Sequence, residues 1–445
     1  MWWDRYLCKL ACALLMALPG VDAALAQTPA PMEKILDRLD ELEKQNRALL
    51  DEIRSLREEV KARQPVGAEA AEDLKDRVGV AENRIAEQAQ SKVGSGQRLP
   101  VSLNGMILFD SNLIHGTGVY SVPANYASYS EGVPGAGATL SQSIIGLRFE
   151  GPSIAGGGQI HGSIAMDFVA GNNNGFGIRN GVISFDWRDR SFTAGQDKTI
   201  IAPLEPTSFA HTGVPALSGA GNLWLWRPQI KFEERHALTP HTKAVFQAAL
   251  FSTDEIYASS LPVLTYVEDT RPALQARLGV THDWSDRTKF SAGIAAHESE
   301  SHVAGKSLPS RVLSGDLLVK PLRWLEVSGT VLHGENFANL GGLPLGVASV
   351  GTNYIPIRGS AGWMQIALPV TSRLTFDAYA GRQVNASRGL TLYQIAGTLV
   401  YAGNVLYRVG PNVMLGFEGG HEDIVFAGHT GILANRYDAT LAYLF

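Results

Sequence analysis

The last ten residues, Arg436-Tyr-Asp-Ala-Thr-Leu-Ala-Tyr-Leu-Phe445, alternate between two kinds of side chain. Every odd position from Tyr437 to Phe445 is aliphatic or aromatic, whereas Arg436, Asp438 and Thr440 occupy even positions. Side chains alternate between the two faces of a strand, so this strand has one apolar and one polar face. About ten residues is the length that a tilted strand needs to cross a bilayer. The stretch therefore predicts a transmembrane β-barrel that is closed by its own last strand.

Bulk composition is compatible with this interpretation but does not decide it. The 445-residue chain has 18% charged residues, 47 glycines and a mean hydropathy of -0.01. No internal apolar run reaches the roughly 18 residues that a membrane helix requires. These features fit a barrel, because alternating strands average out in a hydropathy window. A net charge of -5 gives no nucleic-acid-binding footprint.

The N-terminus predicts export. A basic start and a short apolar stretch over residues 7–18 precede Ala24-Leu25-Ala26, a motif typical of a cleavage site. We therefore expect residues 1–26 to be a signal peptide, and the alternative of a membrane anchor is disfavoured by the short apolar core. Cys8 and Cys12 both lie in this segment, so the mature protein is expected to have no thiol.

Residues 28–64 predict a periplasmic coiled coil. Positions stepping by three and four residues are apolar from Met32 to Val60, except for Asn46, and Glu and Arg fill most outer positions. About four such heptads favour a coil, in which a single Asn can fix the register. The alternative is a single amphipathic helix packed on a domain. The residues at the core positions are compatible with a coil of either two or three helices, and we favour three partly because of the barrel. Residues 65–98 are expected to be a helical and flexible linker.

Residues 99–445 predict the barrel itself. Short alternating segments, separated by Gly, Pro, Asn and Asp, give about sixteen antiparallel strands. The expected strands lie near 101–110, 143–151, 158–169, 176–188, 190–197, 224–236, 241–252, 272–283, 287–297, 310–320, 323–334, 357–368, 372–383, 390–409, 411–421 and 435–445.

Short and long connections between these strands alternate. The long ones are expected at 111–142, 170–175, 198–223, 253–271, 298–309, 335–356, 384–389 and 422–434. Outer-membrane barrels have short periplasmic turns, longer outer loops and an even strand number. Strand one and Phe445 are therefore both expected at the periplasmic rim. Trp187, Trp284 and Trp324 fall beside short turns, where they and Phe445 would form an interfacial aromatic girdle.

The sequence contains no enzymatic constellation, so we expect no catalytic residue, cofactor or metal. Gly305-Lys306-Ser307 resembles the end of a phosphate-binding loop, but position 300 is Glu and the flanks are loop-like. His297-Glu298 and His302 have a spacing one residue longer than the helical metalloprotease motif. In an expected outer loop, they are interpreted as solvated surface.

A barrel of about sixteen strands leaves an aqueous lumen, whose charged side chains set selectivity. Basic residues on the polar parity of their strands could form an anion path, or each could simply make a wall salt bridge. These candidate pore-lining residues are Arg148, Arg188, Arg227, Lys231, Arg235, Arg277, Lys289, Arg373 and Arg436.

The expected loop 198–223 is apolar in patches and poor in charge, with Glu205, Phe209 and His211 in its middle. An outer loop with so many apolar residues is not expected to extend into water. We predict that it folds into the barrel as a constriction. The alternative is that it packs on a neighbouring protomer.

The order of signal peptide, heptad coil, Gly/Ser linker and barrel resembles that of the DcaP-like outer-membrane porins. The resemblance rests on Met32–Val60, on Val101-Ser-Leu-Asn-Gly105 opening the barrel, and on Tyr443-Leu-Phe445 closing it. It implies a homotrimer of sixteen-stranded barrels, with the coil in the periplasm and a preference for small anionic solutes such as dicarboxylates.

These features predict a passive diffusion channel in the cell outer membrane. Its expected partners are outer-membrane lipid, the barrel-assembly machinery, small anionic solutes and further copies of the chain, joined through coil and barrel contacts. The alternative function is a structural envelope protein, in which the barrel anchors a periplasmic tethering coil. A barrel enzyme is disfavoured by the missing constellation.

Overall fold

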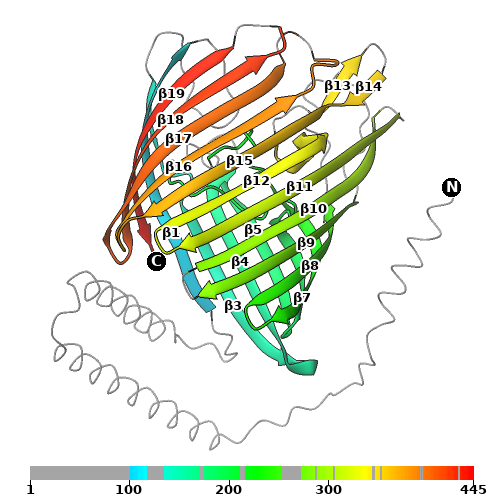
Figure 1. Cartoon of the computed structure of the whole chain (residues 1–445), viewed down its shortest axis with the longest axis vertical. Coiled ribbons are helices and arrows are strands. Elements are labelled where there is room, and N and C mark those ends of the chain that lie inside the picture. Colours follow the sequence, from blue (N-terminus) through cyan, green and yellow to red (C-terminus); the bar gives the residue numbers. More distant parts are fainter. Residues whose placement is uncertain are drawn as a thin grey trace, which may run out of the picture. The chain divides into compact units, whose positions relative to one another are not determined.

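One antiparallel sheet closes on itself to form a barrel (Figure 1). The structure is a computed structural model. It describes residues 101–117, 135–170, 175–210, 216–252, 272–285, 288–303, 306–342, 346–350, 353–390, 392, 394–428 and 431–445. The predicted signal peptide (1–26), coiled coil (28–64) and linker (65–98) lie outside the described residues.

The strands follow one another around the barrel in chain order, each antiparallel to its neighbours. Their bounds are β1 (Val101–Thr117), β2 (Gly135–Thr139), β3 (Ile144–Ile154), β4 (Gly158–Ala170), β5 (Gly175–Asp186), β6 (Arg190–Lys198), β7 (Trp226–Thr239), β8 (Thr242–Ser252), β9 (Pro272–Ser285), β10 (Thr288–Val303), β11 (Lys306–Leu322), β12 (Leu325–Glu335), β15 (Arg358–Pro369), β16 (Leu374–Asn385), β17 (Ile395–Gly410), β18 (Val413–Phe426) and β19 (Ile432–Leu444). A separate hairpin, β13 (Val347–Val350) and β14 (Asn353–Pro356), lies within the predicted loop 335–356.

The short strand β2 and the longer strand β3 together make one strand of the barrel wall. β2 pairs with the 110–114 part of β1, whereas β3 pairs with the 101–106 part of the same strand. Counting them as one, the described residues form a wall of sixteen strands from the seventeen-stranded sheet. This is the predicted number, and each predicted strand overlaps an observed one.

The last strand closes the barrel, as the opening stretch of sequence predicts. β19 pairs with β1 from Met106 opposite Leu444 to Thr117 opposite Leu433. The backbone of Gly105 donates a hydrogen bond to the Phe445 carbonyl oxygen at 2.8 Å and accepts one from the Phe445 amide at 3.1 Å. Backbone groups at this seam are therefore paired out to the last residue, as an unedged barrel requires.

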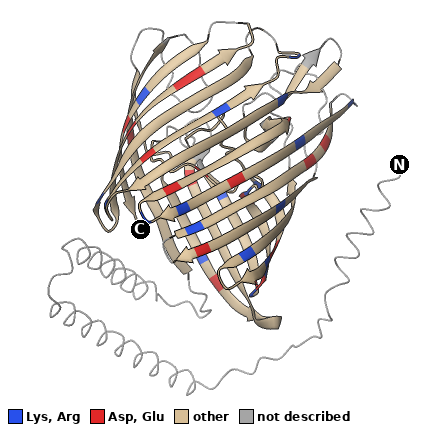
Figure 2. Ribbon diagram, in the orientation of Figure 1, with Lys and Arg blue, Asp and Glu red and all other residues tan. Residues whose placement is uncertain are grey.

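The two faces of the wall differ as predicted. On β19, Tyr437 is 60% exposed and Leu441 is 47% exposed, whereas Asp438 is only 5% exposed and faces inward. β9 and β18 repeat this arrangement, with Leu274 and Phe417 exposed on the outside. Figure 2 shows long uncharged stretches between the charged residues of the strands. The wall thus has the apolar exterior that a bilayer requires.

The predicted outer loop 298–309 is wrong in extent. β10 and β11 continue their pairing to Val303 opposite Lys306, so most of this segment is strand. The prediction ended the strand where apolar alternation ended. The backbone ladder does not require apolar side chains and continues past that point, so polar side chains alternate along it, with Ser299 buried and Glu300 exposed.

Helical structure is minor in the described residues. It comprises the single turns η1 (Ala155–Gly157), in the link between β3 and β4, and η3 (Phe337–Leu340), after β12. Within the described ranges, no helix combines the length and apolarity needed to cross a membrane.

Candidate functional site

The connection from β6 to β7 enters the barrel. It leaves the wall after Lys198 and packs two isoleucines, Ile200 and Ile201, against buried residues on the inner faces of β8 to β12. The Thr199 hydroxyl donates to Gln275 Oε1 at 2.9 Å, and the Ser314 hydroxyl donates to the Ile201 carbonyl at 2.6 Å. Because Gln275 and Ser314 face inward, the start of this connection is held inside the lumen.

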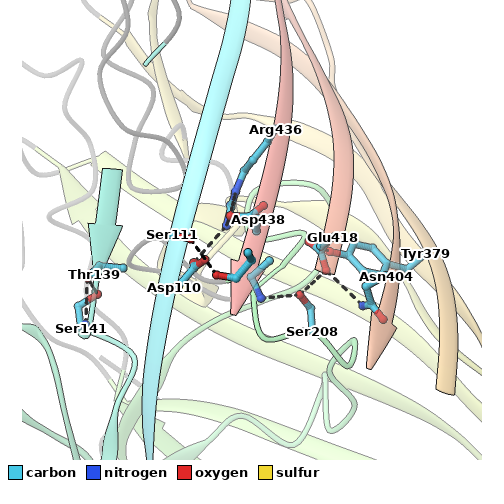
Figure 3. A network of polar contacts seen from close by, with 12 residues as sticks. Asp110, Ser111, Thr139, Ser141, Ser208, Tyr379, Asn404, Glu418, Arg436 and Asp438 are labelled. Atoms are coloured by element: carbon cyan, nitrogen blue, oxygen red, sulfur yellow. Dashed lines mark hydrogen bonds and ion pairs between the residues drawn. The ribbon is translucent and has the colours of Figure 1, made fainter. Parts of the chain in front are cut away.

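The middle of the connection reaches a different part of the wall. The Thr207 amide donates to Gln365 Oε1 on β15 at 2.7 Å, and Asn404 Nδ2 on β17 donates to the Thr207 carbonyl at 3.2 Å. The Ser208 hydroxyl donates to Glu418 Oε2 on β18 at 2.6 Å (Figure 3). The connection thus passes inside the barrel from the inner face of β8–β12 to that of β15–β18.

The returning part of the connection lies directly against the wall. Leu217 has a left-handed backbone (φ 63°) that a non-glycine residue adopts only at a cost, and it is buried with Ala220 against Trp363 and Tyr379. A side chain at Gly221 (φ 104°) would lie 2.5 Å from the Gly362 carbonyl oxygen. Close backbone contact and local strain indicate that the surrounding wall determines this conformation.

The structure describes two of the three residues predicted to form the constriction, and these two differ in exposure. Glu205 is exposed and pairs with Lys198 at 2.8 Å, and Phe209 is half-buried. His211 lies outside the described residues. The pair between Glu205 and Lys198 connects the loop to the end of β6, a contact that the sequence did not indicate.

The wall beneath the loop is acidic. Asp377, Asn404, Glu418 and Asp438 occupy matching inward positions on neighbouring strands from β16 to β19. Glu418 accepts hydrogen bonds from Ser208, Tyr379 and Asn404. Asp377, Asn404 and Asp438 are buried and Glu418 is partly buried, because the loop and neighbouring side chains cover the row.

Arg436 lies among these acidic groups. Its Nη2 atom is 2.7 Å from Asp438 and 3.6 Å from Asp110 on β1 (Figure 3). The sequence left open whether Arg436 lines the solute path or makes a wall salt bridge; its side chain is 12% exposed and is shared between two buried carboxylates, as in a wall salt bridge. Its evident role is to balance charge in the wall.

Four other predicted cations face the lumen. Arg148 is exposed on β3 and Arg227 is half-buried on β7. Lys231 pairs with Asp197 at 2.9 Å and keeps part of its side chain exposed. Arg277 is buried and makes two hydrogen bonds to Asp316, at 3.0 and 2.7 Å. These four therefore differ in access to a solute, with Arg148 and Lys231 better placed than Arg277.

Two other predicted cations, Arg188 and Arg373, lie outside the strand wall, whereas the last two, Arg235 on β7 and Lys289 on β10, lie on strands. Arg188 is in the turn between β5 and β6, and Arg373 is in the turn before β16. Strand parity assigns a residue to a face only within a strand. The predicted strands 176–188 and 372–383 extend into these turns, so the prediction placed Arg188 and Arg373 in the wall. Both lie at the rim that carries the short turns.

That same rim carries the predicted aromatic residues. Trp284, near the end of β9, and Trp324, in the turn after β11, are each about half exposed. Trp187 lies in the next turn along from η1 and donates its indole N–H to the Ala155 carbonyl at 3.0 Å. Phe445 is at the end of β19, next to Tyr443, with ring centroids 6.4 Å apart.

Sequence reasoning missed Arg179. Arg179 has the parity of the outward residues Ile183 and Phe185, so a regular strand would place it on the outside. The register with β4 instead pairs Asn180 with Ala165 and Ile178 with Met166. Arg179 is therefore the extra residue of a β-bulge. The guanidinium lies 3.5 Å from Asp167 and over the ring of Trp226, with a distance of 4.6 Å to the ring centroid. No single-strand pattern indicates such a bulge.

The interpretation of His297, Glu298 and His302 as solvated surface of an outer loop is wrong for His297. His297, Glu298 and His302 lie on β10, with His297 buried on the inner face and Glu298 exposed on the outer face. In the part of the chain that the structure describes, no group of three or more His, Cys, Asp and Glu side chains could hold a metal ion.

Comparison with known proteins supports the fold. No protein-family model matches this sequence, and no curated protein matches it. Among solved structures, the chain is similar to the outer-membrane channel DcaP of Acinetobacter baumannii, with a TM-score of 0.63 and 16% identity, covering 79% of this chain and 99% of that one.

Two further structures share the architecture. The anion-selective porin from Comamonas acidovorans has a TM-score of 0.51 and 12% identity, covering 78% of this chain and all of that one. Outer-membrane OmpT of Vibrio cholerae has a TM-score of 0.50 and 11% identity, covering 80% of this chain and all of that one. The chain therefore has the barrel fold of the DcaP channel, the fold that its resemblance to DcaP-like porins predicts.

Proposed function

We propose that the protein is a porin: a passive channel through which small hydrophilic solutes diffuse across the outer membrane. The observation that carries this proposal is the polar lumen crossed by the β6–β7 loop. A wall that served only as an anchor would not need an internal loop fixed at Gln275, Gln365 and Glu418. A loop that narrows a charged lumen is how a barrel gains selectivity.

The similar structures are consistent with this function. Two of them are an outer-membrane channel and an anion-selective porin. For this chain, the apolar outer face and the aromatic residues at the short-turn rim support an outer-membrane location. The first strand begins at that rim, and the chain ends at the same rim with Phe445. The coil that precedes the first strand would therefore lie in the periplasm.

The preferred solutes are proposed to be small anions, dicarboxylates among them. Asp377 and Asp438 are buried and Glu418 is partly buried, and a covered carboxylate interacts less directly with a passing ion. Arg148 and Lys231 keep accessible ammonium or guanidinium groups on the inner face. The porin from Comamonas acidovorans, described as anion-selective, has a related fold.

Planar-bilayer recording of the purified full chain tests the channel proposal. We expect stepwise conductance and, in a salt gradient, a reversal potential that indicates anion preference. A bilayer that stays silent would contradict the proposal and favour the structural envelope alternative. A variant lacking residues 203–216 tests the loop: its conductance per step should rise, and an unchanged conductance would contradict a constriction at this position.

A homotrimer is proposed as the working assembly, on the basis of the heptad pattern of residues 28–64 and the resemblance to DcaP-like porins. Native mass spectrometry of the full chain should give three copies, and conductance should appear in groups of three steps. Removing residues 28–64 distinguishes the contributions of the coil and the barrel. Trimers that persist after this deletion would assign the assembly to barrel contacts.

A further inference from the structure

Charged residues form a row on the outer face of the barrel. Glu298 on β10 lies opposite Arg311 on β11, Arg311 lies opposite Glu335 on β12, and Glu335 lies opposite Arg358 on β15. Arg311 Nε donates to Glu298 at 2.9 Å, and Arg358 Nε donates to Glu335 at 3.2 Å. Figure 2 shows charged residues of both signs on these neighbouring strands. The row uses outward positions, so it cannot line the lumen.

This row lies one membrane crossing away from the aromatic rim. On β9, Leu274, which is opposite Glu298, lies ten residues before Trp284; on β12, Glu335 lies eleven residues after Trp324. A tilted strand needs about 9–11 residues to cross the hydrocarbon core. Outward residues between these levels on β9 and β12 carry no Asp, Glu, Lys or Arg. The row is therefore at the level of the outer-leaflet headgroups.

Membrane energetics supports this level. An outward Arg costs about 2–4 kcal/mol at the bilayer midplane and about 0–1 kcal/mol near the interfaces. The side chains of Arg311 and Arg358 are 57% and 78% exposed, whereas that of Glu335 is 9% exposed. The guanidinium groups therefore extend beyond the carboxylate that they share. Glu335 positions them by binding Arg358 at its Nε edge and lying 3.8 Å from Arg311 Nη1.

A groove lies beside the row on the same face. It has a volume of about 520 Å³ and is lined by the two arginines and two glutamates of the row and by apolar side chains, among them Leu274, Ala276, Ala296 and Leu313. The two alanines have the shortest of these apolar side chains and so form the floor between the two leucines, which are each more than half exposed. Two guanidinium groups that extend beyond the Glu335 carboxylate, next to an apolar floor, match a molecule that has an anionic head and a hydrocarbon chain.

We propose that this groove binds a phosphorylated, acylated lipid of the outer leaflet, with its phosphate on Arg311 and Arg358 and an acyl chain over Ala276 and Ala296. Guanidinium groups bind phosphate through paired N–H donors, which suits this recognition. The concave floor favours a lipid over a second copy of the chain, because a flat strand face would leave the groove unfilled. The inference rests on the proposed outer-membrane location.

Native mass spectrometry of the full chain, purified in detergent and supplied with bis-phosphorylated lipid A, tests this proposal. The wild type should retain the lipid. The double variant R311Q/R358Q should retain at least tenfold less, because both phosphate partners are lost. R190Q is the matched control, since Arg190 is an exposed cation at the short-turn end of β6. It should retain the lipid as the wild type does.

A second variant keeps the proposal testable if the double variant folds poorly. L313W fills the groove and leaves every charge in place, so it should also reduce retention. Dephosphorylated lipid A should not be retained by the wild type. Equal retention by wild type, R311Q/R358Q and L313W would overturn the proposal, as would loss of subunit assembly with unchanged lipid retention. In bilayers without lipid A, R311Q/R358Q and L313W should both have the conductance of the wild type. Loss of lipid retention with unchanged conductance therefore tests the lipid site independently of the channel proposal.

Discussion

The hydroxyl of Ser208 donates a hydrogen bond of 2.6 Å to the carboxylate of Glu418, although the two residues are 210 positions apart. Ser208 belongs to the β6–β7 loop and Glu418 to the inner face of β18. Tyr379 and Asn404 also donate to this carboxylate (Figure 3). A single, partly buried carboxylate thus connects the loop to two further strands of the wall.

Replacing Ser208 with alanine should loosen the loop. A hydrogen bond to a charged group contributes about 1.5–3 kcal/mol, and its loss leaves Glu418 with fewer donors. We expect single-channel recordings of S208A to show larger current fluctuations at an unchanged or higher mean conductance. S184A is a control, because Ser184 is also on an inner face but bonds Thr193 within the wall. Equal current noise in both variants would contradict the anchoring role of Ser208.

Replacing Asp316 with asparagine should strongly destabilise the barrel. The Asp316 side chain is 2% exposed and accepts two hydrogen bonds from Arg277. Removing one partner of a buried ion pair costs about 3–5 kcal/mol, because it leaves an uncompensated charge. Denaturant unfolding of D316N in detergent should show this loss. The double variant R277M/D316L should be more stable than D316N, since it leaves no buried charge; the opposite order would refute this account.

Alanine at Gly105 should impair closure of the barrel. An added Cβ would lie 2.3 Å from the Ile144 carbonyl oxygen and 2.7 Å from Phe445 Cζ. Such overpacking costs about 1–3 kcal/mol. The heat-modifiable folded band of G105A on SDS gels should therefore weaken. Gly410 has no atom within 4 Å of an added Cβ, so G410A should fold as the wild type does. A folded G105A band of wild-type intensity would show that the space around Gly105 does not limit closure of the barrel.

Replacing Lys231 with glutamine should move selectivity toward cations. Lys231 balances Asp197 at 2.9 Å on the inner face, and its loss leaves that carboxylate uncompensated beside the lumen. The reversal potential in a salt gradient should shift in the cation direction. The R190Q variant again serves as control, because Arg190 lies on the outer parity of β6. A shift of equal size in R190Q would indicate a rim effect instead of a wall effect.

The sequence by itself determined the wall of this barrel. Alternation over 436–445 assigned each residue of the closing strand to a face, because lipid and water impose a period of two on every strand between them. The same rule gave the outward faces of β9 and β18 and the strand number. The pattern of apolar and polar residues along each strand was sufficient here, since every strand lies between lipid on one face and water on the other.

Only the tertiary structure decided what happens inside and at the edges of that wall. The bulge that turns Arg179 inward depends on pairing with β4, and the path of Ser208 depends on acceptors that are distant in sequence. The row formed by Arg311 and Glu335 likewise needs the register between strands. Contacts of this kind join residues that share no local pattern. A period of two therefore predicts the faces of the barrel, whereas register and loop path determine its candidate sites.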